Sequence, residues 1–122
     1  MERSFLGVAK TMNYDVILVG SAGLGGGDAQ LGGLLLANFL RLLGEREEKP
    51  EYIILWNEAV RAAVEGSLWI NHLTRLQQQG VKIISCQTCM EYFGLEGKLA
   101  IGEVTGMLQI QNILFSKRVL TV

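Results

Sequence analysis

The chain has 122 residues, of which 49% are hydrophobic and 19% are charged. This composition excludes a disordered chain, and the length is enough for one domain with a buried core. Eleven Lys and Arg residues against twelve Asp and Glu residues give a net charge of −1, so no basic surface favours nucleic acid. The longest apolar stretch, residues 31–43, is shorter than the roughly 20 residues that span a bilayer. We therefore expect a protein that binds neither nucleic acid nor a membrane.

Residues 1–13 show no clean periodicity, and we interpret them as a leader or linker before one domain of residues 14–122. They contain no apolar h-region, so they do not resemble a secretory signal. The sequence therefore predicts a cytoplasmic protein, whose cysteines are kept reduced.

The rest of the chain alternates between apolar, β-branched runs and segments of helical spacing. The runs predict strands at residues 14–20, 51–56, 81–85 and 119–122. The helical segments are residues 28–43, 59–64, 67–80, 90–93 and 107–114, and residues 94–106 read as loop. This order predicts an α/β fold with three layers, in which a mainly parallel sheet of four or five strands has helices on both faces.

The expected helix at residues 28–43 is apolar around most of its circumference. Asp28 is placed to cap its start, and Gly44 is the expected residue just beyond its end. One side of the helix can cover the sheet, but the other side needs a second partner. Exposed apolar surface of this kind usually marks an interface, so we expect a homo-oligomer.

In an open parallel sheet, functional loops follow the carboxyl ends of the strands. Three loops meet this condition here: residues 20–28, 57–58 and 86–89. They should share one rim, and the residues expected to line it are Gly23, Gly25, Gly26, Gly27, Asp28, Asn57, Gln87 and Thr88.

The glycine-rich loop resembles half of a dinucleotide fingerprint. Its third glycine position is occupied by Asp28, and no acidic residue follows the second strand at the ribose position. A flexible turn beside the site is therefore favoured, with an anion at the helix start as the alternative. We predict no cofactor.

The most informative motif is the pair Cys86 and Cys89, which follows the third expected strand. A thiolate is the reactive form of cysteine, and a helix start stabilises it. We expect Cys86 to face the rim and Cys89 to be partly covered by Met90 and Phe93. The pair then accepts sulfur as a persulfide or undergoes thiol–disulfide exchange; the structural alternative is two small buried side chains. No metal is predicted, because one Cys-x-x-Cys supplies only two zinc ligands and His72 is the single histidine.

Six short segments, in this order, resemble the DsrE/DsrF-like superfamily, in particular the C-terminal domain of YedF-type proteins of sulfur or selenium metabolism. They are Gly27-Asp28…Leu31-Gly32, Lys49-Pro50, residues 64–67, Gly80-Val81, Cys86-x-Thr88-Cys89 and residues 99–105. Where the family usually has Gly after the first cysteine, this chain has Gln87. The loop usually read as Asn-Ser-Gly-Val is here Asn57-Glu58-Ala59-Val60.

The resemblance implies a DsrE/F-like fold with flavodoxin-like topology and an assembly of two, three or six copies. It also selects Cys86 as the sulfur acceptor, because a glycine, Gly94, follows it eight residues later as in related sulfur-relay subunits. The TusA-like domain that often precedes this domain is absent from the sequence, so the sulfur donor is expected to be another protein, such as a TusA-like carrier.

Three functions are consistent with these features. The first is a sulfur or selenium trafficking protein, acting as a persulfide carrier, sulfurtransferase or sulfur-relay subunit through Cys86 and Cys89. The second is an oligomeric binding or assembly protein in which the cysteines are structural. The third is a dithiol oxidoreductase.

Overall fold

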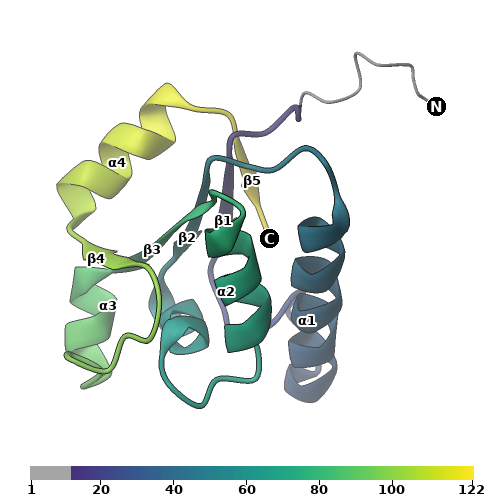
Figure 1. Ribbon diagram of the computed structural model, residues 1–122. Coiled ribbons are helices and arrows are strands. Elements are labelled where there is room, and N and C mark those ends of the chain that lie inside the picture. Colours follow the sequence, from purple (N-terminus) through teal and green to yellow (C-terminus); the bar gives the residue numbers. More distant parts are fainter. Residues whose placement is uncertain (1–11) are drawn as a thin grey trace.

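A computed structural model describes residues 12–122 (Figure 1). Its strands are β1 (Val16–Val19), β2 (Tyr52–Leu55), β3 (Lys82–Cys86), β4 (Glu103–Thr105) and β5 (Val119–Thr121). Its helices are α1 (Ala29–Glu45), the 3-10 helix η2 (Asn57–Ala63), α2 (Ile70–Gln78), α3 (Gln87–Tyr92) and α4 (Met107–Ser116). The leader expected at residues 1–13 lies, apart from its last two residues, outside the described residues.

The five strands form one parallel sheet in the order β4-β3-β2-β1-β5. Figure 1 shows α1 and α4 on opposite sides of the strands, with α2 beside α1. The predicted three-layer α/β fold is confirmed. The order of the strands adds a detail. Strands β1 to β4 are added in one direction across the sheet, and β5 is then added on the other side of β1, so the switch point lies between β1 and β5. In the flavodoxin order the switch point lies between β1 and β3.

The core lies on both faces of the sheet. All four residues of β1 are buried, as expected for a strand covered on each side. Leu36 and Leu40 of α1 and Ile110 of α4 are fully buried parts of the same apolar cluster. None of the helices within residues 12–122 is long and apolar enough to cross a membrane.

The strand β4 was not predicted, because residues 94–106 were expected to be loop. It has only three residues, and two of them are exposed, so it has no apolar alternation to reveal it. Gly102, the residue before β4, has a φ of +77° and lets this strand pair with β3. A Cβ at Gly102 would lie 2.4 Å from the carbonyl oxygen of Ile83, so only glycine permits this approach of the chain to β3.

The prediction that Gly44 lies beyond the end of its helix is wrong. The helix α1 continues to Glu45, and Arg46 ends it in an extended conformation. Gly44 is buried inside the helix, where a Cβ would lie 3.2 Å from Nη1 of Arg75. Gly44 therefore allows α1 to pack closely against Arg75 of α2, and it does not end the helix.

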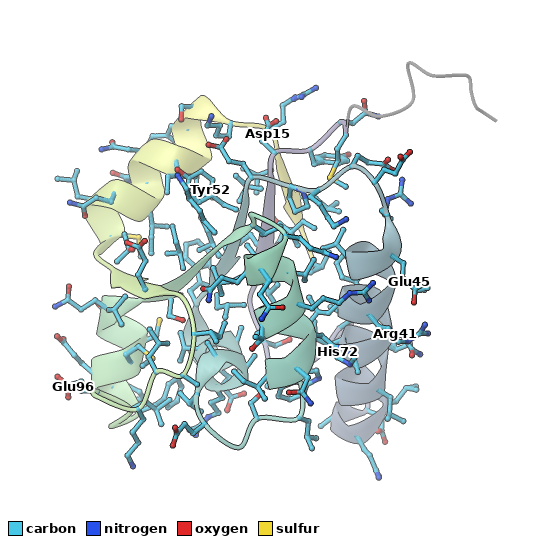
Figure 2. The ribbon with its side chains drawn as sticks, viewed as in Figure 1. Asp15, Arg41, Glu45, Tyr52, His72 and Glu96 are labelled. Atoms are coloured by element: carbon cyan, nitrogen blue, oxygen red, sulfur yellow. The ribbon has the colours of Figure 1, made fainter. Side chains whose placement is uncertain are left out.

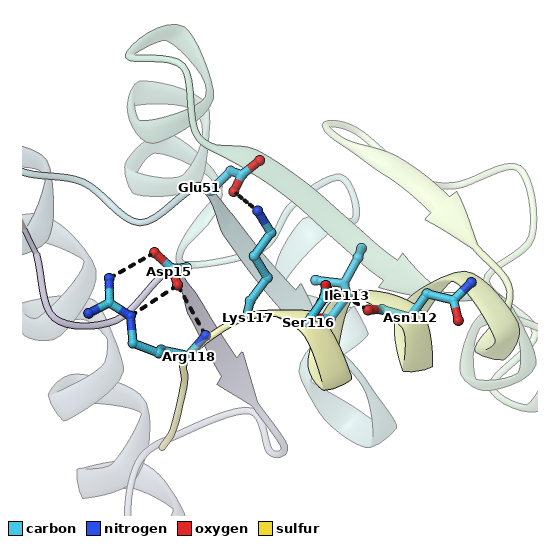
Figure 3. A network of polar contacts seen from close by, with 7 residues as sticks. All are labelled: Asp15, Glu51, Asn112, Ile113, Ser116, Lys117 and Arg118. Atoms are coloured by element: carbon cyan, nitrogen blue, oxygen red, sulfur yellow. Dashed lines mark hydrogen bonds and ion pairs between the residues drawn. The ribbon is translucent and has the colours of Figure 1, made fainter.

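A polar network joins the starts of three strands at the sheet edge opposite the rim (Figure 3). Oδ2 of Asp15 accepts hydrogen bonds from the backbone N–H of Arg118 at 3.0 Å and from its Nε at 3.3 Å. Beside it, Nζ of Lys117 lies 2.9 Å from Oε1 of Glu51. The network thus fixes the start of β5 against the starts of β1 and β2.

We expect Asp15→Asn to weaken the acid dependence of folding stability. Hydrogen bonds from Arg118 hold the pKa of the Asp15 carboxyl below its ordinary value. A lowered folded-state pKa stabilises the fold above the unfolded-state pKa, and this contribution disappears as the pH falls through the folded-state value. Urea midpoints measured through the region below about pH 4 should therefore fall less steeply in Asp15→Asn and in Arg118→Gln than in the unmodified protein. Equal slopes in all three would contradict this role of the pair.

Candidate functional site

The carboxyl ends of β1 and β2 are followed by loops that enclose one hollow of about 270 Å³. Its lining is made of the loop after β1, the start of α1 and one residue of η2. These residues are Ser21, Ala22, Gly23, Gly25, Gly26, Gly27, Asp28, Ala29, Gly32 and Glu58. Five of the residues expected on the rim, Gly23 and Gly25–Asp28, therefore do lie together.

The glycines of this loop have different structural roles. A Cβ at Gly23 would lie 2.8 Å from the carbonyl carbon of Gly32, so Gly23 lets the loop pack directly on α1. Gly25 has a φ of +76° and, like Gly26 and Gly27, open space where a side chain would be. The loop is therefore packed against α1 at Gly23, whereas Gly25–Gly27 at its tip have free space around them.

Carboxylates determine the charge of the hollow. Oδ1 of Asp28 accepts the N–H of Leu31 at 2.8 Å and caps α1 as predicted, and Glu58 lines the opposite loop. Two acidic side chains make the hollow unfavourable for a phosphate or another anion. The anion alternative for this helix start gains no support from the geometry.

The two cysteines lie at the carboxyl end of β3 and are both free thiols. Cys86 is the last residue of the strand and is 1% exposed. Cys89 lies in the first turn of α3 and is half-buried, and its Sγ accepts the backbone N–H of Asn57 at 3.0 Å. The two cysteines lie close together. The structure thus places two free thiols side by side, of which Cys86 is buried and Cys89 is the more exposed.

This arrangement reverses the expected exposure of the pair. Cys86 was expected to face the rim near free N–H groups, but it is buried and its side chain makes no capping hydrogen bond to α3. The strand β3 runs one residue further than predicted, and Cys86 pairs with Thr105 of β4. Met90, four residues on, takes the inward position of the helix and leaves Cys89 at the rim.

The pKa of the Cys89 thiol lies above its ordinary value, because the influences that raise it outweigh those that lower it. Burial raises its pKa above the ordinary value, and the adjacent side chain of Cys86 raises it further. The hydrogen bond from the Asn57 N–H lowers it, because a donor stabilises the thiolate. Asn57, together with the main-chain N–H of Cys89 itself, therefore offsets part of this rise and favours the reactive form.

Asn57 and Glu58 connect the cysteine pair to the hollow. Asn57 contacts Cys89, and its neighbour Glu58 lines the hollow, so all three predicted loops meet at one edge. Gln87 and Thr88 are exposed at the start of α3, and Nε2 of Gln87 donates to Oε2 of Glu91 at 3.1 Å. Asn57, Gln87 and Thr88, unlike the glycine loop, do not line the hollow, and Asn57 contacts Cys89 instead.

Sequence reasoning missed two contributions to this region. One is the main-chain N–H of Asn57, which the sequence signals only through the tolerance of asparagine for a positive φ. The other is Arg61, whose guanidinium lies 4.5 Å above the ring of Phe93 next to the cysteine helix. Within residues 12–122, no three side chains of His, Cys, Asp or Glu are grouped as a metal site, and His72 lies on α2 (Figure 2).

Comparison with known proteins identifies the fold. No family model matches the sequence, and no curated protein matches it. Among solved structures, the ychN protein from E. coli aligns with a TM-score of 0.63 and 23% identity over 89% of this chain and 99% of that one. Protein MTH1491 of unknown function from Methanobacterium thermoautotrophicum aligns with a TM-score of 0.64 and 18% identity, over 88% and 96% of the two chains. Protein BT1422 of unknown function from Bacteroides thetaiotaomicron gives 0.58 and 19%, over 88% and 95%. The chain therefore has the DsrE/DsrF-like fold of the ychN protein.

Proposed function

We propose that this protein is a sulfur-trafficking protein that carries a sulfane sulfur as a persulfide on its cysteine pair. The observation that carries the proposal is a pair of neighbouring free thiols, of which Cys89 is the more exposed and accepts a hydrogen bond from a main-chain N–H. The fold and the resemblance to YedF-type proteins support the same chemistry, with selenium as the alternative cargo.

Loading proceeds by thiolate attack on a donor persulfide. The Cys89 thiolate attacks the outer sulfur of the donor, a new S–S bond forms, and the donor leaves as a thiolate. Cys89 then holds the persulfide. Cys86 is too deeply buried to meet a donor protein directly, so we assign the first attack to Cys89 rather than to Cys86.

The partners follow from this chemistry. The donor is a protein that itself carries a persulfide, such as a TusA-like carrier, and the reaction belongs in the cytoplasm, where both thiols stay reduced. We also propose that the chain forms a homo-oligomer through the outer face of α1. The protein then acts as a sulfurtransferase or sulfur-relay subunit.

Mass spectrometry of the intact protein after incubation with a low-molecular-weight persulfide tests the function. We expect the mass to increase by one sulfur atom, and a thiol reductant should reverse the increase. A protein lacking both thiols, Cys86→Ala/Cys89→Ser, is the control and should stay unmodified.

Two other results would favour the alternative functions. Loss of two hydrogen atoms at the earliest times, with no preceding gain of one sulfur atom, would indicate direct formation of a Cys86–Cys89 disulfide and a dithiol oxidoreductase. No change of mass in the folded protein would indicate that the cysteines are structural and that the chain is a binding or assembly protein.

A further inference from the structure

We infer that Asn57 is a positioning residue, whose left-handed backbone aims its N–H at the sulfur of Cys89. Its φ is +52°, and within residues 12–122 it is the only residue other than glycine with a positive φ. Its N–H lies 3.0 Å from Sγ of Cys89, 32 positions along the chain. The inference rests on the proposed function only in taking Cys89 as the reactive thiol.

The turn around Asn57 is held on both sides by backbone hydrogen bonds. The N–H of Trp56 donates to the carbonyl of Val19 at 3.2 Å, which keeps the end of β2 attached to β1. The N–H of Ala59 donates to the carbonyl of Trp56 at 3.1 Å, which closes the first turn of η2. Between these two anchors the chain must reverse at Asn57, and the reversal directs its N–H toward α3.

The residue type at position 57 matters because left-handed backbone is costly for most side chains. The left-handed region costs roughly 1–2 kcal/mol for an ordinary residue, and asparagine is among the few that enter it readily. A β-branched residue is the least compatible with it. Glycine adopts this conformation without cost, so Asn57→Gly preserves the direction of the N–H, whereas Asn57→Val opposes it.

The consequence is an effect on the charge that the Cys89 sulfur can carry. Burial and Cys86 both disfavour a negative charge on Cys89, and the Asn57 N–H opposes them. A hydrogen bond to a charged group is stronger than one to a neutral group, so this donor acts most on the thiolate and on the persulfide anion. The Asn57 N–H thus offsets part of the rise in the pKa of Cys89 and stabilises the thiolate at that sulfur.

The test measures alkylation of Cys89 by iodoacetamide as a function of pH, in a Cys86→Ala background with a single thiol. We expect Asn57→Gly to have the same pH midpoint of Cys89 alkylation as the Cys86→Ala protein that retains Asn57. In Asn57→Val the midpoint should move to higher pH, and the rate near neutral pH should fall about tenfold, which corresponds to one unit of pKa. Thermal melting confirms that each variant is folded, and Asn57→Ala replaces Asn57→Val if the valine variant is not.

Equal midpoints in the glycine variant and in the folded valine or alanine variant would overturn the inference. A lower midpoint in Asn57→Val would do the same. Because alkylation needs no sulfur donor, the result is independent of whether the protein accepts a persulfide. A chain that never gains sulfur but shows the shift in midpoint would refute the proposed function and leave the role of Asn57 standing.

Discussion

Cys89→Ser should abolish persulfide loading, whereas Cys86→Ala should load one sulfur and release it slowly. The reason lies in the different accessibility of the two thiols. Cys86 is 1% exposed whereas Cys89 is only half-buried, so a donor reaches Cys89 first. Alanine is the suitable replacement for Cys86, because a hydroxyl is more costly to bury at this position than a small apolar side chain.

Release explains why the inner thiol matters. The Cys86 thiolate attacks the inner sulfur of the Cys89 persulfide, a Cys86–Cys89 disulfide forms, and hydrosulfide leaves with the electron pair. The step requires neighbouring thiols, and the two cysteines lie close together at the end of β3 and in the first turn of α3. Without Cys86, the persulfide can be discharged only by an external thiol, so it should persist much longer.

Time-resolved mass spectrometry and a colorimetric sulfide assay measure the two steps separately. Loading that survives in Cys89→Ser but not in Cys86→Ala would restore the assignment implied by the family resemblance, with Cys86 as acceptor. Equally fast sulfide release in Cys86→Ala and the unmodified protein would rule out the disulfide step.

Much of the fold follows from patterns that a single sequence shows clearly. The run of Val16–Val19 is apolar and β-branched, because both faces of that strand are covered, and it ends in a glycine loop. The cap by Asp28 was also predictable, because the N-cap interaction involves residues three apart. By contrast, β4 depends on a tertiary contact, the approach of Gly102 to Ile83, which leaves no local signal.

The sequence predicted where in the fold the candidate site lies, but not which of its two cysteines is exposed. Parallel strands bring their carboxyl ends to one edge, so the meeting of Asn57 with the cysteine loop followed from the order of elements. The exposure of the cysteines depends on where β3 ends and which face of α3 packs inward. An error of one residue in the strand end was enough to exchange the two thiols, since Cys86 and Met90 share the inward face.

The proposed self-association through α1 rests on a feature present in both sequence and structure. Leu31, Leu34, Leu35 and Leu42 are 53%, 61%, 43% and 51% exposed on one side of α1. Figure 1 shows α1 at the edge of the molecule, with α2 as its neighbouring helix. The same side carries Arg41 and Glu45, which form an ion pair at 3.6 Å and give it a polar end (Figure 2). An apolar stripe bounded by charge is typical of a protein interface.

We therefore expect Leu34→Lys to dissociate the oligomer. A lysine without a partner in a closed interface leaves a buried charge, which costs about 3 kcal/mol or more. That cost weakens association about a hundredfold. Sedimentation velocity at micromolar concentration should show a multiple of 13.4 kDa for the unmodified chain and a shift toward the monomer for Leu34→Lys.

Leu108→Lys is the matched control for this substitution. Leu108 lies on α4 and is 66% exposed, against 61% for Leu34, so the two changes add the same charge to surfaces of similar exposure. We expect Leu108→Lys to leave the mass unchanged. If it dissociates the protein while Leu34→Lys does not, the contact between copies runs through α4. A monomer of 13.4 kDa for the unmodified chain would show that the leucine stripe of α1 does not join copies of this protein.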